Sequence, residues 1–175
     1  TLQRGELALR QGSPGTAGQL LRDVEGLPDP GVVGRSDLLQ LEARVAFMRG
    51  DFDAASRAFA NAQALRYQAQ ERADAALSAI GLIQVQLASG AAVGAEEAAR
   101  VQLRDPVVIE QPRLQRAARL AVAAALRNQG RADALAEQLK LLDALLAEAP
   151  EAEDALHAAL LRTELDATPA ERAER

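Results

Sequence analysis

Four glycines recur along the chain at nearly constant spacing, and they constrain the fold more than any other feature. Gly12, Gly50, Gly90 and Gly130 are separated by 38, 40 and 40 residues. Each follows a helical pattern that ends in small or polar residues, and each precedes an Ala- or Leu-rich segment. Glycine readily adopts the left-handed backbone that ends a helix. A helix–turn–helix at fixed spacing predicts stacked hairpins, because one hairpin cannot bury its apolar face alone.

The hairpin expected over residues 36–65 shows this pattern most clearly. Ser36 is a candidate N-cap, and apolar residues then recur at helical spacing up to the turn. Asp51 is a candidate N-cap of the second helix, which carries Ala55 and Phe59 on one side. Two antiparallel helices with a turn of about two residues are therefore predicted.

Helical periodicity also predicts the other elements. Two prolines and a glycine predict a loop over residues 27–31. The segment Val107–Gln111 is either extended, or it leads into a helix with Pro112 in its first turn. The other expected helices are residues 2–10, a helix capped by Thr16 that ends at Gly26, residues 68–89, 95–104, 112–129 and 131–148, and a last helix after Pro150.

Composition supports an all-α fold. Hydrophobic residues make up 49% of the chain but aromatic residues only 2%, so the apolar content is mainly Ala, Leu and Val. Ala and Leu have high helix propensity, and Val107–Ile109 is the only β-branched run. We predict an α-solenoid of about four helix–turn–helix repeats, forming a single domain over residues 1–167. A non-repeating helical bundle with four turn glycines is the alternative. The charged segment 168–175 is either a frayed tail or the start of a further element.

Charge and residue types exclude several functions. The net charge of −5 argues against nucleic acid as a direct partner. The absence of cysteine excludes disulfides, thiolate metal sites and cysteine nucleophiles. No apolar run approaches the roughly 20 residues of a membrane span, and no secretory signal is visible, so a cytoplasmic protein is expected. Because the first residue is Thr1 rather than Met, we expect a processed chain or an excised domain.

Catalytic constellations are not recognisable, so we predict that the protein is not an enzyme and has no metal or cofactor. His157 is the only histidine, and only Glu153 lies one turn away from it. Asp51 and Asp53 are better explained as a cap and a first-turn charge than as an acid–base pair. Three arginines, Arg113, Arg116 and Arg119, lie on one side of the helix predicted over residues 112–129. They form either a solvated charged face or a surface that binds an acidic partner.

The central turn resembles the tetratricopeptide repeat family. The run Gly50-Asp51-Phe52-Asp53-Ala54-Ala55 is similar to that family's turn and second-helix start, and Ala55 and Phe59 reproduce its A-x-x-x-F spacing. Ala43 resembles the small residue at which the two helices cross. The period of 38 to 40 residues is longer than the family's 34 and also fits HEAT-like helical pairs. The weaker matches in the other repeats are Gly5, Ala17, Leu21, Pro28, Pro30, Pro106, Ala123 and Leu139.

The resemblance implies a right-handed superhelix whose first helices line a concave groove for a protein partner. Gln40, Arg44 and Phe47 form one stripe on the first helix of the hairpin 36–65. Adding or subtracting the spacing between the turn glycines gives the equivalent positions in the other repeats. The shifted positions are Leu2, Glu6 and Leu9; Ile80, Gln84 and Leu87; and Leu120, Ala124 and Arg127. From these we predict the partner-binding residues Gln40, Arg44, Phe47, Gln84, Leu87 and Arg127.

Because the predicted stripe is mostly apolar, a helix or an apolar peptide is the expected ligand. We expect a partner protein, a dimer mate or a missing segment to cover Phe47 and Leu87. The alternative is that both are core residues and that the stripe lies a third of a turn away. Two function classes remain open: a non-catalytic protein-interaction scaffold, and a sensor or coupling domain of a larger bacterial transcriptional or signalling regulator.

Overall fold

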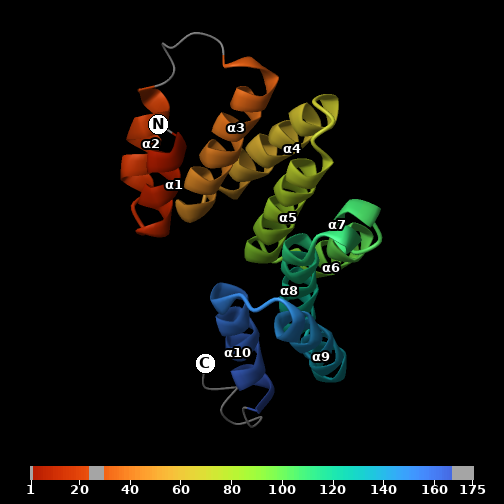
Figure 1. The fold of residues 1–175 in the computed structure, drawn as a ribbon. Helices are drawn as coiled ribbons and strands as arrows, with labels where there is room; N and C mark the ends of the chain where they lie inside the picture. The colour runs from red at the N-terminus through yellow and green to blue at the C-terminus, as the bar shows by residue number, and fades with distance from the viewer. Residues whose placement is uncertain (1, 24–29, 167–175) are drawn as a thin grey trace. The chain divides into compact units, whose positions relative to one another are not determined.

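The computed structural model describes residues 2–23 and 30–166 (Figure 1). Ten helices and no strands occur within these residues, which confirms the predicted all-α class. Predicted features at Gly26, over most of the loop 27–31 and over the tail 168–175 lie outside the described residues. The helices are α1 (Leu2–Arg10), α2 (Pro14–Arg22), α3 (Gly31–Met48), α4 (Phe52–Gln68), α5 (Arg72–Ala88), α6 (Ala92–Gln102), α7 (Pro106–Glu110), α8 (Pro112–Asn128), α9 (Ala132–Glu148) and α10 (Ala152–Asp166).

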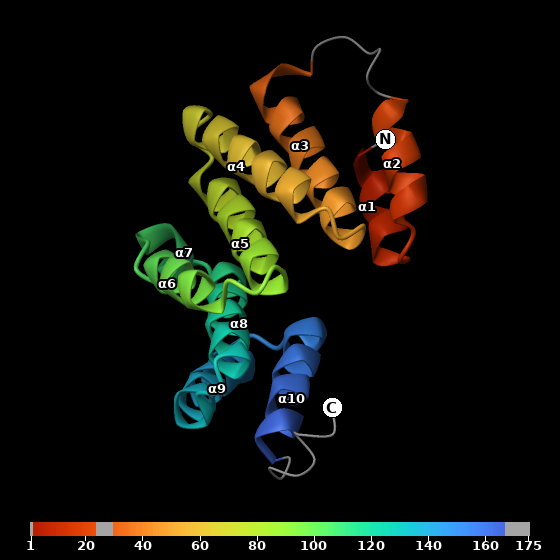
Figure 2. The same ribbon diagram turned by 180° about the vertical axis from the view of Figure 1, so that it is seen from behind.

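The chain divides into two compact units, and the boundary falls between Ser89 and Gly90. In unit 1, each of the helices α1 to α4 packs on the helix that follows it, and α1 also contacts α3 (Figures 1 and 2). In unit 2, α6 and α7 pack on α8, α8 packs on α9, and α10 contacts both α8 and α9. The arrangement of the predicted repeats as one continuous domain stays a prediction.

All four periodic glycines end a helix with a positive φ angle, as predicted. The angles are 69° at Gly12, 77° at Gly50, 88° at Gly90 and 70° at Gly130. A side chain is strained in this left-handed conformation, which explains why these four turns carry glycine. Gln70 adopts the same conformation with a φ of 61° and forms a turn that the glycine pattern did not reveal.

The N-caps were predicted with mixed success. Asp51 caps α4 as expected, because its carboxylate accepts a hydrogen bond from the Ala54 N–H at 3.0 Å. The prediction for Ser36 was wrong: α3 begins at Gly31, and the buried Ser36 hydroxyl donates to the Val33 carbonyl at 2.7 Å. Ser36 therefore satisfies its hydroxyl inside the helix, as serine can do by bonding to a carbonyl of the preceding turn.

Other helix starts also differ from the predictions. Thr16 is not a cap, because α2 already begins at Pro14. The helix predicted over residues 68–89 begins at Arg72, because α4 extends to Gln68 and the turn at Gln70 follows it. The helix predicted over residues 95–104 starts earlier, because α6 begins at Ala92.

The ambiguous segment before α8 is helical. The extended alternative for Val107–Gln111 was wrong, because α7 occupies Pro106–Glu110 and the Asp105 carboxylate accepts from the Val107 N–H at 2.9 Å. Pro112 is in the first turn of α8, as the other alternative predicted. Proline suits that position because its missing N–H would have no helical partner there.

The core of unit 1 depends on one aromatic ring and two small residues. Phe59 is only 4% exposed and packs in a cluster with Ala43 and Val85. A Cβ atom at Gly81 would lie 2.4 Å from Cε1 of Phe59, so glycine allows α5 to approach the ring of α4 closely. A Cβ atom at Gly5 would lie 2.5 Å from Cδ2 of Leu41, so the same device joins α1 to α3.

One interhelical hydrogen bond recurs in both units at equivalent positions. In unit 1, the guanidinium of Arg49 donates to the Pro14 carbonyl, 35 residues earlier, at 3.3 Å. In unit 2, the side-chain amide of Gln129 donates to the Ala92 carbonyl, 37 residues earlier, also at 3.3 Å. Both donors stand immediately before a turn glycine, and both acceptors stand two residues after the preceding turn glycine. The two units therefore share a local packing register.

Candidate interaction surfaces

Helix α3 lies between two cavities in unit 1. We call the first the first-helix groove; its volume is about 590 Å3, and it is lined by Leu2, Gln3, Glu6, Leu7, Arg10, Asp37, Gln40, Arg66 and Asp74. We call the second the α2–α4 cavity; its volume is about 580 Å3, and it is lined by Gly18, Leu21, Arg22, Arg35, Leu38, Leu39, Glu42, Val45, Ala46, Arg49, Asp51, Ala54 and Leu65. Helix α3 contributes Asp37 and Gln40 to the first-helix groove, and residues from Arg35 to Ala46 to the α2–α4 cavity. Because successive residues are 100° apart around a helix, these two sets lie on largely opposite faces of α3.

A buried arginine organises one end of the first-helix groove. Arg66 is in the last turn of α4, where a cation interacts favourably with the helix dipole. Its guanidinium forms ion pairs with Asp37 of α3 and Glu71 of the following turn, and it lies 3.6 Å from Asp74 of α5. Because an unpaired buried charge is costly, these carboxylates make Arg66 a link between three helices.

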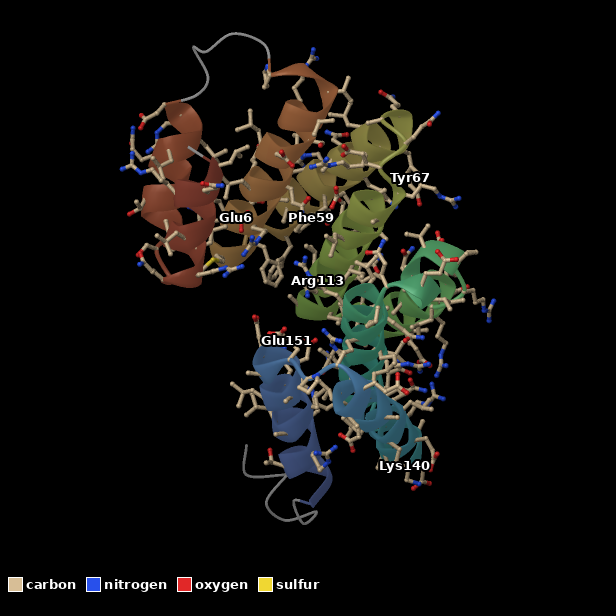
Figure 3. All side chains as sticks on the ribbon, in the orientation of Figure 1. Glu6, Phe59, Tyr67, Arg113, Lys140 and Glu151 are labelled. Atoms are coloured by element: carbon tan, nitrogen blue, oxygen red, sulfur yellow. The ribbon has the colours of Figure 1, made fainter. Side chains whose placement is uncertain are left out.

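A second ion pair crosses the groove between the first helices of successive hairpins. Arg44 of α3 is paired with Glu6 of α1, which is 38 residues earlier in the chain. Figure 3 labels Glu6 on α1. Both side chains remain 38% exposed. Arg44 and Glu6 therefore hold α1 against α3 while leaving part of their polar surface accessible.

The structure brings together only some of the predicted partner-binding residues. Gln40 lines the first-helix groove, and Arg44 is paired with a residue of that groove. Phe47 packs against the α3–α4 core, and its ring centroid lies 6.0 Å from that of Phe52. On α5, Gln84 is exposed and Leu87 is half-buried.

The remaining predicted stripe positions are mostly buried or lie in the other unit. Leu9 and Ile80 are both 4% exposed and belong to the core. Arg127 is an exposed residue of α8 in unit 2, where its guanidinium donates to the side chain of Asn128. The groove in unit 1 is consequently more polar than the sequence suggested, because several apolar positions turn toward the core.

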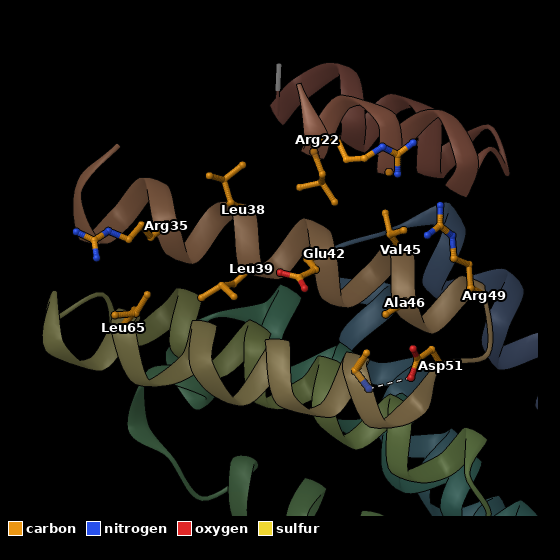
Figure 4. A pocket seen from close by; sticks show the side chains of 13 residues that line it. Arg22, Arg35, Leu38, Leu39, Glu42, Val45, Ala46, Arg49, Asp51 and Leu65 are labelled. Atoms are coloured by element: carbon orange, nitrogen blue, oxygen red, sulfur yellow. Dashed lines mark hydrogen bonds between the residues drawn. The ribbon is translucent and has the colours of Figure 1, made fainter. Parts of the chain in front are cut away.

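The α2–α4 cavity was not predicted. Figure 4 shows Leu38 on the side of α3 toward α2 and Leu39 on the side toward α4, and both are half-buried. Helix α2 has 9 residues, whereas α3 has 18 and α4 has 17, so α2 is too short to run along the whole of α3. This difference in helix length was the available signal, and imprecise helix boundaries hid it.

The three arginines of α8 do not form one solvated face, which corrects that interpretation. Arg113 is exposed (Figure 3), but Arg116 is only 5% exposed, and its Nε donates to the Asp154 carboxylate of α10 at 2.7 Å. Arg119 is half-buried and donates to Gln138 of α9 at 3.4 Å, and burial lowers its pKa. Arg116 therefore joins α8 to α10 instead of facing a partner.

A second polar cluster surrounds Glu96 in the second turn of α6. Its carboxylate accepts hydrogen bonds from Arg100 at 2.9 Å, from Gln129 at 2.9 Å and from Arg131 at 2.8 Å. Burial raises the pKa of Glu96, but the hydrogen bonds from Gln129 and Arg100 and the charges of Arg131 and Arg100 outweigh it, so the pKa lies below its ordinary value. The cluster connects α6 to the turn between α8 and α9.

Neither a metal site nor a membrane span is present in the described part of the chain. Groups of three or more His, Cys, Asp or Glu side chains that could hold a metal ion do not occur among residues 2–23 and 30–166. His157 is exposed on α10. None of the described helices combines the length and the apolar character needed to cross a membrane.

Comparison with known proteins found no match among protein-family models, curated proteins or solved structures. The tetratricopeptide-like resemblance therefore stays a prediction.

Proposed function

We propose that this chain is a non-catalytic protein-interaction scaffold built as a TPR-like α-solenoid of about four helical hairpins. The recurring hydrogen bonds of Arg49 and Gln129 support the repeat, because equivalent positions make the same contact in both units. The four turn glycines with positive φ support it as well. Stacked hairpins expose the side chains of successive first helices along one face, which is where a repeat protein of this kind binds its partners.

The observation that carries the proposed function is the first-helix groove. It has the size of a ligand-binding cleft, and charged and amide side chains from four helices line it. Leu7 is 54% exposed in its wall and offers an apolar contact. Glu6 is paired with Arg44, but Asp37, Asp74 and the adjacent Glu71 share the guanidinium of Arg66, so carboxylates are in excess at that end of the groove.

This lining favours a particular kind of partner. A helix or extended peptide with an apolar residue could contact Leu2 and Leu7, and a basic residue beside it would meet the excess carboxylate. The proposed partner is therefore amphipathic with at least one Lys or Arg, which is more polar than the apolar peptide expected from the sequence alone.

The test begins with affinity capture from the native organism and mass spectrometry. The purified partner is then titrated by isothermal calorimetry against the wild-type protein and two variants. Gln40→Arg adds a positive charge inside the groove, whereas Gln68→Arg makes the same change at an exposed position of α4 that lines neither cavity. We expect Gln40→Arg to weaken binding about tenfold or more, in the range of an interface position that costs over 1 kcal/mol, and Gln68→Arg to leave it unchanged. Equal affinity of both variants, with unchanged melting temperatures, would exclude the groove as the binding site.

A further inference from the structure

Helix α10 carries apolar side chains on two opposite faces. Ala158 and Leu161 are buried on the side where α10 contacts α8 and α9. Leu156 and Leu160 are 60% and 54% exposed. Because successive residues are 100° apart around a helix, Leu156 and Leu160 point almost directly away from Ala158. Within unit 2, packing of α10 therefore accounts for one face only.

The outward face of α10 has the pattern of a docking helix. Glu153, Leu156, Leu160 and Thr163 recur at intervals of three and four residues, and all four are exposed. Two leucines one turn apart are the usual anchors of a helix that binds in a groove. Glu153 adds a negative charge one turn before the first leucine, and the exposed Glu151 lies close to it in the sequence.

The α2–α4 cavity complements this helix face in shape and charge. Leucine, valine and alanine side chains from three helices line it, and its volume of about 580 Å3 exceeds what two leucine side chains occupy. Three guanidiniums, those of Arg22, Arg35 and Arg49, and two carboxylates, those of Glu42 and Asp51, belong to its lining, so the charged lining is net positive. The Asp51 carboxylate is already engaged with the N-terminal backbone of α4. The cavity thus accepts an apolar helix with an acidic flank, and α10 has both features.

We propose that the chain self-associates, with Leu156 and Leu160 of one copy inserted into the α2–α4 cavity of a second copy. Glu153 of the inserted helix then lies near the arginines of the cavity. Reciprocal insertion gives two identical contacts and closes a dimer, whereas one-way insertion would extend into larger assemblies. This surface lies on the other face of α3 from the first-helix groove, so self-association does not depend on the partner proposed for that groove.

The first experiment measures association directly. Sedimentation velocity of the full chain over a range of concentrations should reveal a dimer that Leu156→Glu together with Leu160→Glu dissociates, raising the dissociation constant at least tenfold. Leu141→Glu is the matched control, because Leu141 is a 46% exposed leucine of α9 that lines neither cavity. The pair Leu156→Ala and Leu160→Ala repeats the test if the glutamate variant melts earlier. A protein that stays monomeric at millimolar concentration, or association unchanged by both leucine pairs, overturns the proposal.

A second experiment locates the contact. Because the chain contains no cysteine, single introduced cysteines form unambiguous disulfides. A Leu160→Cys chain mixed with a Leu38→Cys chain should yield a cross-linked heterodimer under mild oxidation, whereas a Leu141→Cys chain mixed with the same partner should not. If the leucine variants dissociate the dimer but this cross-link fails to form, α10 docks elsewhere and the assignment to the α2–α4 cavity is wrong.

Discussion

The close approach of α5 to Phe59 leads to a stability prediction with an internal control. A Cβ atom at Gly81 would lie 2.4, 2.6 and 2.8 Å from Cε1, Cζ and Cδ1 of Phe59, whereas ordinary contacts begin near 3.4 Å. Gly81→Ala therefore forces the buried ring to move by about 1 Å, and overpacking of this kind costs about 1–3 kcal/mol. Alanine also gains up to about 1 kcal/mol of helix propensity over glycine.

Gly15→Ala separates these two effects. Gly15 lies in α2, and a Cβ atom there would have no neighbour within 4 Å. Both substitutions gain helix propensity, but only Gly81→Ala meets the ring. We therefore expect Gly81→Ala to be less stable than Gly15→Ala by about 1–3 kcal/mol in free energy of unfolding.

Urea denaturation followed by tyrosine fluorescence is a suitable assay. The chain has one tyrosine and no tryptophan, and this tyrosine, Tyr67, lies on α4 (Figure 3). Gly15 and Gly81 belong to the same unit as Tyr67, so its fluorescence reports on the unit that both substitutions change. Phe59→Leu removes the ring edge, so adding it to Gly81→Ala should recover about 0.5–3 kcal/mol as a coupling energy. The reasoning is refuted if Gly81→Ala stabilises unit 1 as much as Gly15→Ala does.

Three further predictions concern polar contacts. Asp51→Ala removes the cap of α4 and should cost about 0.5–2 kcal/mol in the same fluorescence assay, and a loss near zero would mean that the cap is unimportant. Asp154→Ala leaves the buried Arg116 without its carboxylate and should cost about 3–5 kcal/mol, with faster amide hydrogen exchange in α10; unchanged exchange there would contradict this. The lowered pKa of Glu96 stabilises the fold above its unfolded-state pKa, near 4.5, and this contribution is lost as pH falls through the folded-state value. The melting temperature should therefore fall less between pH 6 and pH 3 for Glu96→Gln than for wild type, and equal slopes would exclude this linkage.

Helix turns and one helix cap could be predicted from the sequence, because each depends on a single residue. The turn glycines were found because only glycine adopts a positive φ at little cost, and Asp51 was found because a carboxylate in that position accepts an N–H. Ser36 carries the same kind of signal as Asp51 but lies within a longer helix. The five residues of α3 before it contain two glycines and two valines, and helix propensity alone would not extend a helix over them.

The candidate surfaces were harder to predict, because they depend on which helix covers which face. Helical periodicity grouped Gln40, Arg44 and Phe47 on one side, and two of these do lie beside the first-helix groove. It could not show that Phe47 turns toward Phe52 and the α3–α4 core. A rotation of a third of a turn separates a groove residue from a core residue, and this is less than the uncertainty in the ends of the predicted helices.

The contacts shared by the two units explain why the repeat is hard to recognise from residue identities. Arg49 and Gln129 donate to equivalent carbonyls, yet one is a guanidinium and the other an amide. Their neighbours six residues after the preceding turn glycine also differ: Gly18 leaves room for the Arg49 guanidinium, whereas Glu96 accepts a hydrogen bond from Gln129. A long cation beside glycine and a shorter amide beside a carboxylate fill the same space in two ways. The packing register can therefore persist between hairpins whose residues differ, with the turn glycine as the one feature that the backbone itself requires.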